Sequence, residues 1–145
     1  MSEEDVELVR RWLAWLPDLR DLEPADDDAV ADRALRDYLD ESFELHLPAD
    51  YPEGEHIFRG REGILQYSEW LRSVWAEWRF EPERFIDTGE HVVTFLRIVA
   101  RSTSGLPLDV ASTQVVAIRG GRIASIHAYR DRSQALKAAG LQDQL

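Results

Sequence analysis

Apolar residues in the first part of the chain recur at spacings of three and four, which is the period of one helix face. The first such stretch covers residues 2–16; it begins at Ser2, a residue type that caps helices, and ends at Pro17. After an acidic connector over residues 18–28, a second stretch covers about residues 28–39. Both predict amphipathic helices whose apolar faces pack on another layer of the fold.

A strictly alternating segment, residues 42–47, predicts a half-buried strand that ends at Pro48. Residues 48–60 are predicted to form a loop, and residues 61–78 a third helix. This helix would present the most aromatic surface in the chain. Its aromatic residues are Tyr67, Trp70, Trp75 and Trp78.

The second half of the chain alternates short runs rich in β-branched residues with turns that contain glycine or proline, the pattern of antiparallel strands. The predicted strands cover residues 80–87, 91–101, 108–118 and 123–130. A short helix over residues 132–139 follows. We therefore predict one α+β domain over residues 1–145, with three helices on one face of a curved antiparallel sheet that encloses a cone-shaped cavity.

Composition narrows the classes of partner. The 145 residues include 28 acidic and 17 basic ones, a formal net charge of −11, which argues against nucleic acid because phosphate binding needs a basic face. Apolar runs are too short to span a membrane, and the acidic start is unlike a signal peptide, so we expect a cytoplasmic protein. Without cysteine, the chain has no thiol nucleophile or thiolate metal site. We expect no cofactor and no metal ion.

Three segments resemble the SnoaL-like branch of the nuclear transport factor 2-like superfamily. They are the start of the third helix, Gly60-Arg61-Glu62-Gly63-Ile64, the last strand from Gly121 to Asp131, and the tail from Asp131 to Leu141. The resemblance implies the cone-shaped fold of that superfamily. It leaves function open, because this fold hosts polyketide cyclases, ketosteroid isomerases, epoxide hydrolases, dehydratases and non-catalytic binding domains.

The resemblance also implies that the usual proton-transfer residues are missing. SnoaL-type cyclases and limonene epoxide hydrolases carry a catalytic aspartate at the position that Ala128 occupies here. Ketosteroid isomerases carry their base where this chain has Leu45 and a protonated aspartate near Gln114, and Trp12 stands in place of their oxyanion-hole tyrosine. The family's acid and base positions are therefore not retained.

Strand alternation divides the remaining residues between the two faces of the sheet. On the face toward the cavity we expect Arg97 to pair either with a carboxylate of the protein, such as Asp109 or Glu44, or with a ligand anion. Alternation places both carboxylates on the opposite face. The predicted ligand-binding residues are Trp12, Phe43, Leu45, Tyr67, Trp70, Phe95, Arg97, Gln114, Ile126, Ala128 and Arg130. The predicted inward set also includes Leu47, Val93, Val99, Ser112, Val116 and Ile118.

The outward set is chemically richer and contains Glu44, His46, Ser125, His127, Tyr129 and Asp131. Histidine near carboxylates favours a general base or a metal ligand, but the spacing does not bring His46, His56 and His127 together. The alternative is an interface, and we expect a homodimer through this outer sheet face.

Three functions follow. The first is a pocket that binds a small hydrophobic or aromatic molecule, one that could carry a carboxylate, without transforming it. The second is an enzyme of the cyclase, isomerase or dehydratase type that uses His46, Asp109, His127 or Tyr129 as its acid or base. The third is a role in pairing alone.

Overall fold

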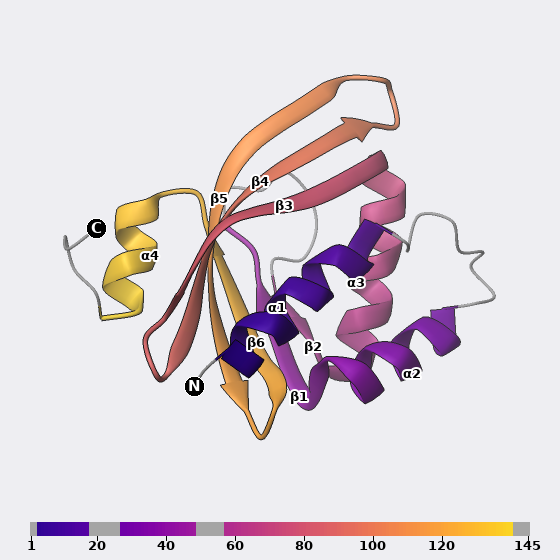
Figure 1. Ribbon diagram of the computed structural model, residues 1–145. Helices are drawn as coiled ribbons and strands as arrows, with labels where there is room; N and C mark the ends of the chain where they lie inside the picture. Colours follow the sequence, from indigo (N-terminus) through magenta and orange to yellow (C-terminus); the bar gives the residue numbers. More distant parts are fainter. Residues whose placement is uncertain (1–2, 18–26, 49–56, 141–145) are drawn as a thin grey trace.

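A curved, open six-stranded sheet organises the computed structural model, which describes residues 3–17, 27–48 and 57–140 (Figure 1). The strands are β1 (Leu39–His46), β2 (Ile57–Arg59), β3 (Trp75–Asp87), β4 (His91–Ser102), β5 (Pro107–Arg119) and β6 (Arg122–Tyr129). Their order across the sheet is β2-β1-β6-β5-β4-β3. Strands β1 and β6 run parallel, whereas the other neighbours are antiparallel.

The helices lie on both sides of this sheet. Helices α1 (Glu3–Trp15), α2 (Asp27–Asp37) and α3 (Gly60–Val74) cover one face, and α4 (Arg132–Ala138) lies on the other (Figure 1). The prediction of an α+β fold with three helices on a curved sheet and a short last helix is confirmed. Among the described residues, no helix is long and apolar enough to cross a bilayer.

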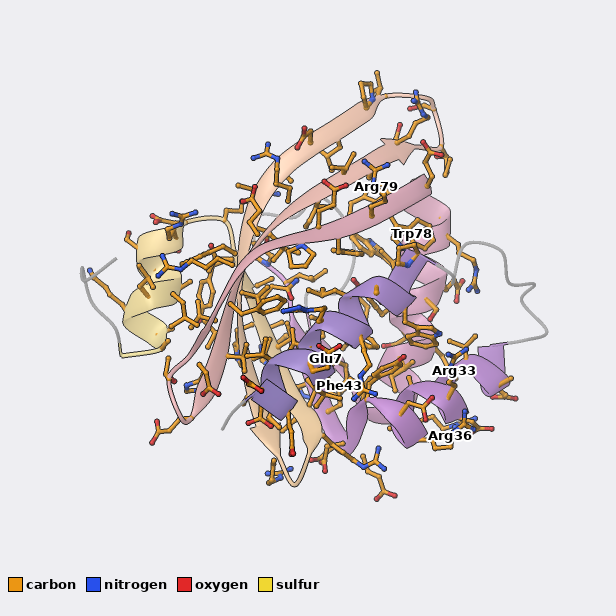
Figure 2. The ribbon with its side chains drawn as sticks, in the orientation of Figure 1. Glu7, Arg33, Arg36, Phe43, Trp78 and Arg79 are labelled. Carbon is orange, nitrogen blue, oxygen red and sulfur yellow. The ribbon has the colours of Figure 1, made fainter. Side chains whose placement is uncertain are left out.

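An aromatic core fills the space between the sheet and the first two helices. The Trp12 ring lies 5.7 Å from that of Trp15 and 5.8 Å from that of Tyr38, measured between centroids. Phe43 of β1 meets Trp12 edge-on at 6.4 Å, and Trp78 of β3 is buried in the same core (Figure 2). Aromatic side chains therefore hold α1 and α2 to the sheet.

The third helix is shorter than the sequence predicts. It ends at Val74, and Trp75 already has an extended backbone that begins β3. A bulge between Trp75 and Glu77 shifts the register of β3, so that Trp75 and Trp78 are both buried although they are three residues apart. A bulged strand thus produced the spacing that is typical of a helix.

The β1–β2 region also differs from the prediction. β1 begins at Leu39 rather than residue 42, and Ile57–Arg59 forms a strand where a loop was predicted. Residues 49–56 of that loop, including His56, and most of the acidic connector lie outside the described residues.

The predicted inward face of β4 is wrong. Val93 and Phe95 pack against Leu136 of α4, whereas Val92 and Leu96 join the core beneath α1 to α3. Arg97 and Val99 lie on the α4 side with Val93, because strand neighbours two apart share a face. The other strands are as predicted, with Phe43, Leu45, Val116, Ile118 and Ile126 in or against the core.

Candidate functional site

The parallel pairing of β1 and β6 brings the carboxyl ends of both strands to one place. Leu45 lies beside Ile126, and His46 beside His127. Both strands end here, and α4 begins at Arg132 with Asp131 as its N-cap. A pocket of about 490 Å³ lies at this junction. Its lining residues include His46, Leu47, His127, Ala128, Tyr129 and Arg130.

Two stacked imidazoles form one wall of this pocket. The His46 and His127 rings are 4.1 Å apart and nearly parallel, at 13°. The Nε2 atom of His46 lies 2.8 Å from Oε1 of Glu44, close enough for an Nε2–H to donate a hydrogen bond. That bond is the main reason why the pKa of Glu44 lies below its usual range. The carboxylate therefore orients the His46 ring.

The second imidazole is shifted toward its neutral form. Partial burial lowers the pKa of His127, and the neighbouring His46 lowers it further, while Glu44 acts in the opposite direction. At neutral pH, His127 therefore presents an uncharged ring with one donor and one acceptor nitrogen. The pocket combines a carboxylate-linked imidazole with a neutral one.

We expect the His127 pKa to lie below 6.5 when its ring protons are titrated by NMR. His46→Gln should raise this pKa, because it removes a like charge, and Glu44→Gln should lower it. A folded-state pKa below the unfolded value means that the unfolded chain binds the proton first, so this group makes the fold less stable as the pH falls below about 6.5. A His127 pKa at or above 6.5 would contradict this account of the pocket.

The predicted residues Arg97 and Asp109 lie elsewhere. Nε of Arg97 is 2.8 Å from Oδ1 of Asp109, and both side chains are substantially exposed on the outer face of β4 and β5. Of the two alternatives for Arg97, the protein carboxylate is therefore the observed one. Strand alternation argued against Asp109 as the partner of Arg97 only because the sequence analysis assigned Arg97 to the wrong face of β4. Neither residue lines the pocket, and neither does Phe95, whose ring lies 4.2 Å from the Arg132 guanidinium.

Most of the other predicted ligand residues face the interior but pack against one another. Trp12, Phe43, Leu45 and Ile126 are buried in the core. On α3, Tyr67 and Trp70 are half-buried and stack at 6.1 Å. None of these six residues lines the β1–β6 pocket, and Gln114 lies one strand away, opposite Ala128. Of the predicted ligand set, Ala128 and Arg130 are the residues that line it.

Sequence analysis missed the meeting of His46 with His127. It placed Leu47 on the inward face but did not include it among the ligand-binding residues. One signal for it is present: Leu45-His46-Leu47 and Ile126-His127-Ala128 share the order apolar, histidine, apolar. The order becomes informative only once the two strands are known to be parallel neighbours. Within the described ranges, no three His, Asp or Glu side chains are placed to hold a metal ion.

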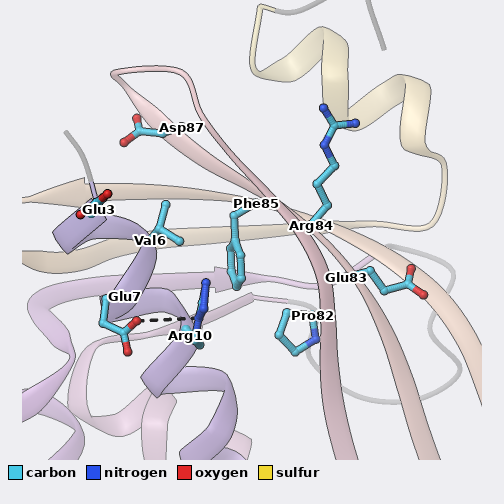
Figure 3. A pocket seen from close by; sticks show the side chains of 9 residues that line it. All are labelled: Glu3, Val6, Glu7, Arg10, Pro82, Glu83, Arg84, Phe85 and Asp87. Atoms are coloured by element: carbon cyan, nitrogen blue, oxygen red, sulfur yellow. Dashed lines mark ion pairs between the residues drawn. The ribbon is translucent and has the colours of Figure 1, made fainter.

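A second, larger hollow of about 870 Å³ lies between α1 and β3 (Figure 3). The Arg10 guanidinium lies 4.9 Å from the centre of the Phe85 ring and 3.7 Å from the Glu7 carboxylate. Arg10 and the Phe85 ring therefore already contact each other. This hollow contains no histidine, so the β1–β6 pocket is the stronger candidate for chemistry.

Comparisons with known proteins agree with this geometry. A family model described as the SnoaL-like domain matches residues 9–126, and no curated protein matches. A nuclear transport factor 2-like protein of unknown function from Burkholderia pseudomallei K96243 is 18% identical, with 94% of this chain and 97% of that chain covered and a TM-score of 0.67.

Two further solved structures are similar over nearly their whole length. A candidate SnoaL-like polyketide cyclase from Jannaschia sp. CCS1 is 15% identical, with 100% of this chain and 97% of that chain covered and a TM-score of 0.68. TerC, co-crystallised with polyporic acid, is 20% identical, with coverages of 96% and 98% and a TM-score of 0.66.

The helix-covered open sheet and these structures define a nuclear transport factor 2-like fold. The chain belongs to the SnoaL-like domain family, whose model covers most of its length.

Proposed function

We propose that this protein binds a small, largely hydrophobic molecule that carries a carboxylate, and that it does so in the β1–β6 pocket without transforming it. The observation that carries this proposal is Ala128 in the pocket wall, where the resemblance places the catalytic aspartate of SnoaL-type cyclases. A methyl group cannot move a proton. The complex of TerC with polyporic acid supports a small molecule as the class of ligand.

The pocket offers matching surfaces for such a ligand. Leu47, Pro48 and Ala128 provide apolar contact, and Arg130 provides a guanidinium that suits a carboxylate. His127 adds positive charge once it is protonated, and its pKa lies below 6.5. Binding of a carboxylate should therefore strengthen as the pH falls below about 6.5.

Isothermal titration with 2-naphthoate tests the proposal. We expect a dissociation constant below about 1 mM and about tenfold weaker binding for Arg130→Gln, since a hydrogen bond to a charged group contributes about 1.5–3 kcal/mol. Arg84→Gln is the matched control, because Arg84 lines the hollow between α1 and β3. The neutral analogue 2-naphthalenemethanol should bind Arg130→Gln as tightly as it binds the unchanged protein. Absence of 2-naphthoate binding, or an equal loss for both compounds, contradicts the proposal.

The 2.8 Å contact between Glu44 and His46 favours a second candidate function, proton transfer with His46 as the base. Tyr129 lines the same pocket, whereas Asp109 does not. In D₂O the protein would then accelerate exchange of the acidic C–H protons of 2-tetralone, and His46→Gln would abolish that acceleration. An exchange rate equal to that of buffer rules out this candidate for that probe.

We also propose that the chain pairs with a second copy through the outer sheet face and acts in the cytoplasm. The exposed polar residues on this face, such as Arg97 and Asp109, are the motivation for the pairing. Sedimentation equilibrium would then give twice the chain mass of 16.7 kDa, and the mass of a single chain would refute the pairing.

A further inference from the structure

The last helix is held on the outer sheet face by a small apolar cluster of its own. Leu136 of α4 packs on Val93 and Phe95 of β4, and among the described residues this cluster is separate from the core beneath α1 to α3. The Arg132 guanidinium adds a contact, 4.2 Å from the centre of the Phe95 ring. A segment that buries few apolar side chains opens more easily than the core of the same protein. Helix α4 can therefore detach while the main core stays intact.

Helix α4 does not keep its helical form once it leaves the sheet. It has 7 residues, whereas isolated helices shorter than about 12–15 residues are marginal in water. Its first turn is fixed by Asp131, whose Oδ1 accepts hydrogen bonds from the backbone N and from Oγ of Ser133, 2.9 and 2.8 Å away. Docking and folding of α4 are therefore one event, with a docked and a detached state.

The first turn of α4 is also a wall of the β1–β6 pocket. Asp131, which caps the helix, and Gln134 line the pocket together with His127 and Tyr129 of β6. The strands hold their pocket residues in place whether or not α4 is docked, but Gln134 lines the pocket only in the docked state. A ligand that contacts both walls therefore binds the docked state more tightly and raises its population.

We propose that α4 is a ligand-controlled latch: it detaches locally in the empty protein, and a ligand in the β1–β6 pocket holds it on the sheet. The proposal concerns the regulation of that pocket and rests on the proposed function. The coupling between the two sites is reciprocal. Ligand binding therefore makes the detached state rarer, and loss of docking weakens ligand binding.

Hydrogen exchange measured by NMR, with and without 2-naphthoate, tests the latch. The reporter amides are those of Ala135 and Ala139, which donate to the carbonyls of Asp131 and Ala135 at 3.2 and 3.0 Å. At ten times the dissociation constant, 2-naphthoate should slow their exchange about tenfold, because a ligand that needs the docked state protects it in this proportion. In the free protein they should exchange about 100-fold faster than the amide of Val116, a fully buried core residue.

Leu136→Asp tests the reverse direction of the coupling. A charge placed beneath α4 should detach the helix, so that Ala135 and Ala139 lose their protection while Val116 keeps it. The affinity for 2-naphthoate should fall about tenfold, since the ligand loses its contacts with the first turn of α4. Ala138→Asp is the matched control. It adds the same charge to the exposed side of the same helix and should keep the affinity within about twofold.

The outcomes separate this proposal from the proposed function. Binding of 2-naphthoate that leaves the exchange of Ala135 and Ala139 unchanged overturns the latch and leaves the pocket standing. So does a Leu136→Asp variant that loses the protection of α4 but binds as tightly as Ala138→Asp. If Leu136→Asp does not fold, as lost protection of Val116 would show, exchange in the unchanged protein decides. Absence of 2-naphthoate binding contradicts the proposed function and the ligand control of α4 together.

Discussion

Replacing Trp78 by alanine is expected to lower the free energy of unfolding by about 3–5 kcal/mol, a large part of the total stability of a domain of this size. Trp78 is only 1% exposed and is among the largest fully buried side chains. Its indole Nε1–H donates a hydrogen bond to the carbonyl of Leu16, 3.0 Å away, just after the end of α1. The substitution therefore creates a cavity and also releases the end of α1 from the sheet.

Urea denaturation of two further variants separates these effects. Trp78→Phe keeps much of the ring but leaves the Leu16 carbonyl without its donor, so it should cost about 1–3 kcal/mol. Trp70→Ala removes a half-buried tryptophan of α3 and should cost clearly less than Trp78→Ala. A loss below 1 kcal/mol for Trp78→Ala would show that this tryptophan is not part of the core.

Gly63→Ala is expected to destabilise the protein by about 2–3 kcal/mol, the usual range for an overpacked core. In an exposed helix the same change gains about 1 kcal/mol, because alanine favours helix formation. Here a Cβ atom at residue 63 would lie 2.6 Å from the backbone carbonyl carbon of Phe58. Backbone cannot rotate away as a flexible side chain can, so α3 and β2 would have to separate.

The strain should also reach the pocket. In the β1–β2 pairing, Phe58 lies opposite Leu45 and Ile57 lies opposite His46. A shift of β2 therefore moves His46, which is hydrogen-bonded to Glu44. Gln66→Ala, at an exposed position of the same helix, is the control and should change the stability by less than about 0.5 kcal/mol. An increase in stability for Gly63→Ala would mean that α3 packs differently on β2.

The order of elements could be predicted from the sequence because most strands alternate clearly and most turns contain glycine or proline. For β4, the sequence could not show which side chains face α1 to α3, since the residues on both faces of this strand are apolar. Val92 and Leu96 alternate with Val93 and Phe95, and either row is hydrophobic enough to meet a helix. The structure buries both rows, one beneath α1 to α3 and the other beneath α4. Periodicity cannot distinguish the faces of a strand that is covered on both sides.

The sequence analysis identified several residues of the candidate site but did not predict that they lie together. His46, His127 and Tyr129 were recognised as chemically able residues, and Ala128 as the substituted catalytic position. Their convergence depends on the parallel pairing of β1 with β6, two strands that lie far apart in the sequence. Local sequence patterns contain no information on such a distant pairing.

Mapping 2-naphthoate onto the protein by ¹⁵N–¹H NMR tests the central claim most directly. A ligand in the β1–β6 pocket should shift the backbone amides of His46, His127 and Arg130, and the shifts should saturate with a single dissociation constant. Shifts confined to Val6 and Phe85 would place the ligand in the hollow between α1 and β3 and contradict the account, as would a spectrum that 2-naphthoate leaves unchanged.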